Sequence, residues 1–65
     1  MIDTKKVKSR MRDLKMQSKD LAQKVHVSPT MMCYILQGVR TPSLTTTANI
    51  AEVLGMKIDE IVKHN

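Results

Sequence analysis

The side chains of this sequence that could do chemistry are mainly basic. Residues 1–40 contain nine Lys or Arg and three Asp or Glu, a net charge of +6. Residues 41–65 contain two Lys or Arg and three Asp or Glu, a net charge of −1. A basic half on a small protein suits a polyanion such as nucleic acid. The alternative interpretation is a solvated surface that only keeps the protein in solution.

Residue types that could support catalysis or metal binding are few. Cys33 is the single cysteine, so it can form no internal disulfide and cannot alone supply the four ligands of a typical zinc site. The sequence places no His or acid to activate this thiol, and it contains no phosphate-cradling glycine loop or paired-carboxylate motif. We therefore predict no enzymatic activity, no metal and no cofactor.

Length and composition predict a small helical protein. A chain of 65 residues is at most one domain, so we expect a single domain over residues 1–65, of marginal stability for its size. Two Gly and two Pro interrupt the sequence rarely, which favours helices. We find neither an apolar run of the ~20 residues that span a membrane nor an apolar signal-peptide core. The expected location is cytoplasmic, without membrane contact.

Apolar periodicity predicts an all-α fold of five helices. We place them at about residues 4–15, 17–25, 29–37, 44–54 and 57–63. Their apolar stripes predict these core residues: Val7, Met11, Leu14, Leu21, Ala22, Val25, Met32, Leu44, Thr47, Ile50, Ala51, Leu54, Ile58, Ile61 and Val62.

Capping residues mark several helix ends. Asp3 or Thr4 can cap the first helix, and Ser28, followed by Pro29, caps the third. Ser43 caps the fourth helix in the same way. Further end signals are Gly38, which is expected to stop the third helix in a left-handed conformation, and Gly55, which is expected to end the fourth. His26 is expected at a turn with positive φ.

Residues 18–38 contain the most informative pattern in the chain. Two short helices are separated by a few residues around His26 and Val27, and Ala22 is small where a larger side chain would hold the helices apart. Val25, Val27, Met32 and Ile35 can close the corner between the two helices. A tight turn with a small residue inside it and a second helix that projects outward is the arrangement of a helix-turn-helix.

Several segments resemble the phage-repressor and Cro type of helix-turn-helix domain, also called lambda-repressor-like. The resemblance extends from about Val7 to Val62. Its matching segments are Leu21-Ala22-Gln23-Lys24-Val25, Val27-Ser28, Gly38-Val39-Arg40-Thr41-Pro42-Ser43-Leu44, and Ile50-Ala51 to Leu54-Gly55. The resemblance implies a compact five-helix fold, a bacterial or phage regulator, operator DNA as ligand, and a third helix that enters the major groove.

The resemblance also assigns candidate contact residues. Base contacts are implied at the start and outer face of the third helix: Ser28, Pro29, Thr30, Met31 and Tyr34, with Cys33 and Gln37 at the margin. Phosphate contacts are implied at the start of the second helix, at the end of the third and in the loop that follows: Gln17, Ser18, Lys19, Gln37 and Arg40.

The predicted third helix departs from the usual chemistry of base recognition. Major-groove contacts usually come from Arg, Lys, Asn or Gln, whereas Thr30, Met31 and Tyr34 can touch thymine methyl groups. An exposed row of Met31, Tyr34 and Leu36 would also suit a protein interface, because Met and Tyr are enriched there. The alternative hypothesis is therefore an antirepressor or antitoxin-like protein that binds a partner protein, such as a repressor.

The resemblance implies a symmetric dimer on a palindromic operator, with half-sites about one helical turn apart. Because the sequence ends after the predicted fifth helix, we expect any homodimer to use that helix, the loop before it or the tail, and to be weak without DNA.

Overall fold

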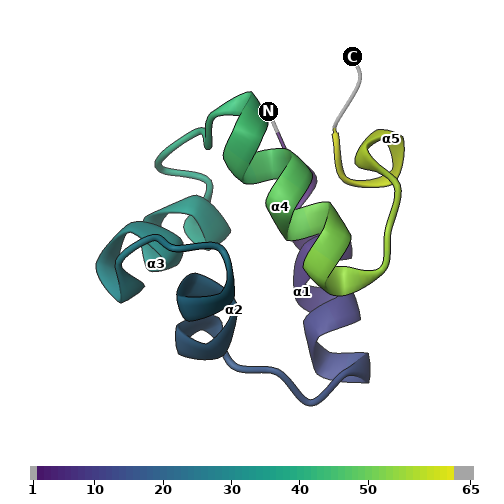
Figure 1. Ribbon diagram of the computed structural model, residues 1–65, viewed down its shortest axis with the longest axis horizontal. Coiled ribbons are helices and arrows are strands. Elements are labelled where there is room, and N and C mark those ends of the chain that lie inside the picture. Colours follow the sequence, from purple (N-terminus) through teal and green to yellow (C-terminus); the bar gives the residue numbers. More distant parts are fainter. Residues whose placement is uncertain (1, 63–65) are drawn as a thin grey trace.

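A computed structural model describes residues 2–62 of the chain. These residues form five α-helices and one isolated antiparallel β-bridge, between Ile2 and Val62 (Figure 1). The all-α prediction is confirmed. The helices are α1 (Thr4–Asp13), α2 (Ser18–Lys24), α3 (Pro29–Gln37), α4 (Leu44–Leu54) and α5 (Ile58–Ile61).

The bounds of α3 and α4 agree with the sequence prediction because both ends of each helix have strong local signals. Ser28 Oγ accepts from the Met31 amide at 3.0 Å, and Ser43 Oγ accepts from the Thr46 amide at 3.1 Å. Gly38 and Gly55 follow the two helices with φ of 80° and 66°. Glycine takes this left-handed conformation without a Cβ conflict, so both helices stop where their caps predict.

The first and fifth helices are shorter than predicted. α1 ends at Asp13, and Lys15 turns the chain with φ of 55°, while the Met16 amide donates to the Met11 carbonyl at 2.8 Å. α5 ends at Ile61 because Val62 is extended and pairs with Ile2. Residue 63 of the predicted fifth helix lies outside the described residues.

The core confirms most of the predicted apolar stripes. Val7, Leu21, Met32, Ile50 and Ile61 are completely buried. The other buried side chains are Ile2, Met11, Ala22, Val25, Ile35, Leu36, Thr47, Ala51 and Leu54. Ile2, at the start of the chain, is a core residue that periodicity missed, because it lies before the first helix.

Three residues predicted in the core are exposed. Leu14 is 42% exposed, Leu44 77% and Ile58 39%. Leu14 lies beyond the last residue of α1, where the helical stripe no longer applies. Leu44 and Ile58 are the first residues of α4 and α5, and helical side chains point back toward the N-terminus, past the edge of the core. Val62 is only partly buried.

α2 and α3 form the helix-turn-helix and make the largest helix–helix contact of the described residues. Ala22 is 1% exposed, and its carbonyl accepts from the Val27 amide at 3.0 Å across the turn. His26 occupies that turn with φ of 61°, as predicted. In Figure 1 the pair lies at one end of the molecule and α5 at the other, with α1 and α4 between them.

A hydrogen bond from Arg10 connects α1 to the end of α4. The Nε of Arg10 donates to the Leu54 carbonyl at 2.8 Å, one of the carbonyls that a helix end leaves without an intrahelical partner. None of the helices in residues 2–62 has the length and apolar character needed to cross a bilayer.

Candidate nucleic-acid interface

The start of α3 is held rigidly at the surface. Ser28 caps the helix through Met31, and Pro29 occupies its first turn with a φ already suited to a helix. The Met32 amide donates to the Ser28 carbonyl at 3.0 Å. Ser28, Pro29 and Thr30 are all exposed, so the first turn is both ordered and accessible to a ligand.

α3 has one exposed and one buried face. Met32, Ile35 and Leu36 form the buried face. The exposed face continues from Thr30 through Cys33 and Tyr34 to Gln37, a spacing that forms one stripe on a helix. Tyr34 is 45% exposed. We call these four residues the α3 stripe.

The sequence predicted an exposed apolar row of Met31, Tyr34 and Leu36, and two of these residues are less exposed than predicted. Leu36 is only 7% exposed and belongs to the core, so it cannot contact a partner. Its position, one residue after Ile35 and four after Met32, puts it on the buried side of α3. Met31 is half-buried and packs against the core, so it borders the α3 stripe with part of its side chain.

The predicted phosphate contacts near α2 lie at its first turn. Gln17 is the N-cap residue, and its amide donates to Asp20 Oδ2 at 3.1 Å. Gln17 and Lys19 are exposed and Ser18 is half-buried. The amides of Ser18 and Lys19 precede the first intrahelical bond, and the helix dipole favours an anion near them.

Lys19 lies close to the start of α3. A surface hollow of about 570 Å³ is lined by both Lys19 and Pro29, with Asp20, Gln23 and Val27. The structure thus brings a predicted phosphate contact beside a predicted base contact.

Arg40 lies in the loop after α3 and borders a second hollow. This hollow, of about 420 Å³, is lined by Val27, Met31 and Arg40, together with Ile35, Val39, Thr41, Pro42, Ser43 and Thr46. The amides of Val39 and Arg40 both donate to the Tyr34 carbonyl, at 3.0 and 3.3 Å. These bonds fix the loop after α3 against the helix, so Arg40 is anchored through its backbone while its side chain is exposed.

Sequence reasoning assigned no role to Val39 and Thr41, although both are exposed in this loop beside Arg40. Gly38 signalled the loop. The sequence contained no signal for which of its side chains would face outward, because a loop has no repeating geometry.

Charge is distributed in favour of an anion at this surface. No Asp or Glu occurs between residues 21 and 51, while Lys24 and Arg40 lie within that range. The stretch includes all of α3 and its following loop. A polyanion approaching α3 therefore meets no carboxylate from α3 or that loop, and Asp20, the nearest acid before it, is bonded to the Gln17 amide.

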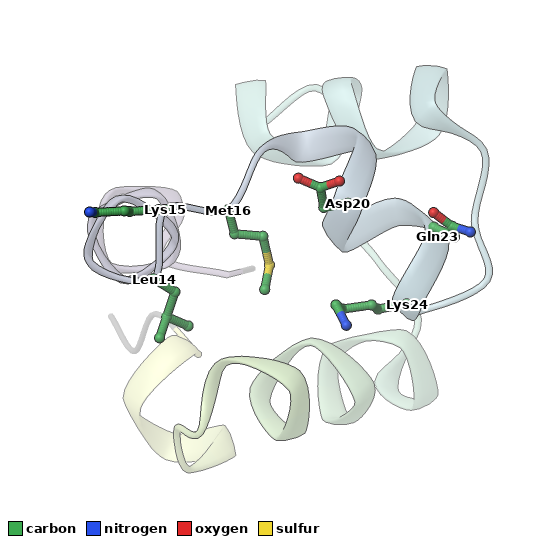
Figure 2. Close-up of a pocket in the computed structure, with 6 residues that line it drawn as sticks. All are labelled: Leu14, Lys15, Met16, Asp20, Gln23 and Lys24. Carbon is green, nitrogen blue, oxygen red and sulfur yellow. The ribbon is translucent and has the colours of Figure 1, made fainter.

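A third hollow, between the end of α1 and α2, does not have the chemistry of an active site. Figure 2 shows Met16 and Lys24 extending into it, whereas Lys15 points away. Its one carboxylate, Asp20, is already used at the start of α2. Within residues 2–62, no three His, Cys, Asp or Glu side chains gather where they could hold a metal ion.

The family described as the Cro/C1-type HTH DNA-binding domain matches residues 6–65 of the chain. No match was found among curated proteins or among solved structures.

Proposed function

Because the chain belongs to the family of Cro/C1-type HTH DNA-binding domains, we propose that it is a transcription regulator that binds a specific operator in double-stranded DNA. The observation that carries the proposal is the α3 stripe, exposed and neutral, with Lys19 beside the start of α3 and Arg40 in the loop after its end. Cations near both ends of α3 can contact phosphates of the DNA while α3 enters the major groove.

The proposed contacts divide into two groups. Side chains from the first turns of α3 touch base edges: Ser28, Pro29, Thr30, Met31 and Tyr34. Groups around them position the protein on the phosphates: Gln17, Ser18, Lys19, Gln37 and Arg40. Phosphate contacts supply affinity that does not depend on sequence, and base contacts supply the choice of operator.

The proposed assembly is a symmetric dimer on a palindromic operator, formed in the cytoplasm by one domain of residues 1–65. Two copies of α3 would then enter successive major grooves about one helical turn apart. The proposal includes no cofactor and no catalytic step.

A salt titration tests the role of Arg40. Fluorescence anisotropy would measure binding to promoter DNA from the same genome and to generic DNA between about 50 and 200 mM salt. Arg40→Gln should weaken binding to promoter DNA and to generic DNA. It should also reduce the steepness of log K against log [salt] by about 0.9 for each phosphate contact that is lost.

Lys8→Gln is the matched control. It removes the same charge from an exposed residue in the middle of α1, outside the proposed DNA contacts and outside the surface expected for the dimer. If Arg40→Gln and Lys8→Gln change the slope equally, only net charge matters and the proposed interface is wrong. If no promoter binds better than generic DNA, the operator proposal fails.

A second candidate is a protein-binding antirepressor or antitoxin-like function, favoured by the exposure of Tyr34 at 45% and Val39 at 66%. The burial of Leu36 removes one member of the apolar row on which this hypothesis first depended. It predicts a host or phage protein whose capture is lost on Tyr34→Ala and kept on Lys8→Gln. If the protein captures no partner but binds an operator, the antirepressor or antitoxin-like function is wrong.

A further inference from the structure

The chemistry of the α3 stripe restricts what it can recognise in DNA. Residues 29–37 contain no Arg, Lys, Asn, Asp or Glu. The side chains that usually form bidentate hydrogen bonds with guanine or adenine are Arg, Lys, Asn and Gln, and Gln37 alone represents them in α3.

Gln37 is poorly placed for a bidentate contact. It is the last residue of α3, roughly 10 Å along the helix axis from Thr30 at a rise of about 1.5 Å per residue. Its Nε2 donates to Cys33 Sγ at 3.6 Å. A bidentate contact with adenine needs the amide nitrogen and the amide oxygen directed at the same base, whereas this conformation turns the amide nitrogen toward Cys33 and leaves one of its two N–H groups for another partner.

The remaining polar groups discriminate weakly between bases. The hydroxyls of Thr30 and Tyr34 can each donate or accept, so either can bond to several bases. The distinctive groups of this surface are apolar: the Thr30 methyl, the Tyr34 ring and the exposed part of Met31. Their backbone is fixed by the Ser28 cap and by the buried Met32 and Ile35.

On the major-groove edges of the four bases, the thymine methyl is the one apolar group. We propose that α3 selects its operator chiefly through the 5-methyl groups of thymines, contacted by Thr30, Met31 and Tyr34. This inference rests on the proposed operator binding. Lys19 and Arg40 supply affinity for any DNA, and the methyl contacts supply the preference.

Deoxyuridine substitution tests the inference directly. The operator is first selected from a random DNA pool, and each of its thymines is then replaced in turn by deoxyuridine, which keeps every hydrogen-bonding group and removes only the methyl. At two or more thymines in each half-site, the affinity should fall about threefold to fivefold per methyl, the usual effect of burying one carbon.

Protein variants locate the contacts. Thr30→Ser keeps the hydroxyl and removes the side-chain methyl, so one thymine should lose its advantage over deoxyuridine. Thr45→Ser makes the same change on an exposed residue of α4 and should leave all thymine preferences intact. Tyr34→Phe should bind the operator within twofold of the original protein, whereas Tyr34→Ala should bind it more weakly.

The outcomes separate this inference from the proposed function. An operator that is bound selectively but loses less than twofold at every deoxyuridine overturns the methyl inference and leaves operator binding intact. A pool that yields no selected sequence overturns operator binding and the inference with it. A large loss on Tyr34→Phe would show that the hydroxyl, not the ring, is the specific group.

Discussion

At the turn between α2 and α3, one non-glycine residue adopts a left-handed backbone conformation. His26 adopts φ of 61° there, in the left-handed region. A Cβ in this region lies too close to the following carbonyl oxygen, which costs L-residues about 1–2 kcal/mol. His tolerates the conformation better than β-branched residues do, so the fold keeps the turn at some cost in stability.

His26→Gly should therefore stabilise the protein. Removal of the Cβ relieves the conflict, and part of the gain is offset by the greater freedom of glycine in the unfolded chain. We expect the free energy of unfolding to rise by about 0.5–1 kcal/mol, as measured by urea denaturation followed by circular dichroism.

His26→Ala is the control, because it removes the exposed imidazole and keeps the Cβ. It should not stabilise the protein. Equal stability of the Gly and Ala variants would mean that the turn carries no backbone strain.

Predictions for single residues are correct where a residue type strongly prefers one local backbone geometry. Ser28, Ser43, Gly38 and Gly55 were placed correctly because capping depends on neighbours within a few positions. Leu14, Leu44 and Ile58 were placed wrongly. Periodicity shows which side of a helix is apolar, but it does not show where the neighbouring helix stops covering that side.

At the scale of the element, α4 shows how a helix start is fixed. Ser43 Oγ accepts from the Thr46 amide at 3.1 Å and donates to Thr46 Oγ1 at 3.0 Å. The Ser43 carbonyl accepts from the Thr47 hydroxyl at 2.9 Å. This start also ends the loop that carries Arg40, so the cap connects helix stability to the proposed interface.

Ser43→Ala should lower the free energy of unfolding by about 1 kcal/mol, the usual effect of losing an N-cap side chain. Chemical denaturation would measure this change. Ser9→Ala alters the same residue type at an exposed site within α1, where Ala is the better helix former, so stability should be unchanged or slightly higher. Equal losses in the two variants would contradict a capping role for Ser43.

At the element scale, the exposed surface of α3 was predicted in part. The sequence predicted α3 with its correct bounds and its neutral side chains, and the structure places Thr30, Cys33, Tyr34 and Gln37 on one exposed stripe. The sequence did not predict that Leu36 would be buried. The angle at which α3 meets its neighbours decides how wide its covered face is, and that angle depends on contacts distant in the sequence.

At the scale of the whole molecule, the two ends of the described chain are joined. The Asp3 amide donates to the Ile61 carbonyl at 2.6 Å, and Ile2 pairs with Val62. Sequence periodicity could not predict this pairing, because it joins residues 60 positions apart through a single bridge. The closure holds α5 against the rest of the core at the end opposite α3 (Figure 1).

Ile2→Ala tests how much the closure contributes to global stability. Ile2 is 7% exposed and belongs to the core, so its truncation should lower the free energy of unfolding by about 2–3 kcal/mol. Ile58→Ala makes the same change at a residue 39% exposed, and should cost less than about 1 kcal/mol because less apolar area leaves the water on folding. The loss expected for Ile2→Ala would remove much of the stability of so small a domain. Amide hydrogen exchange would show whether Ile2→Ala unfolds α5 alone, because only the amides near Ile61 would then lose protection. In that case the pairing of the two ends stabilises α5 locally, and the molecule does not unfold cooperatively.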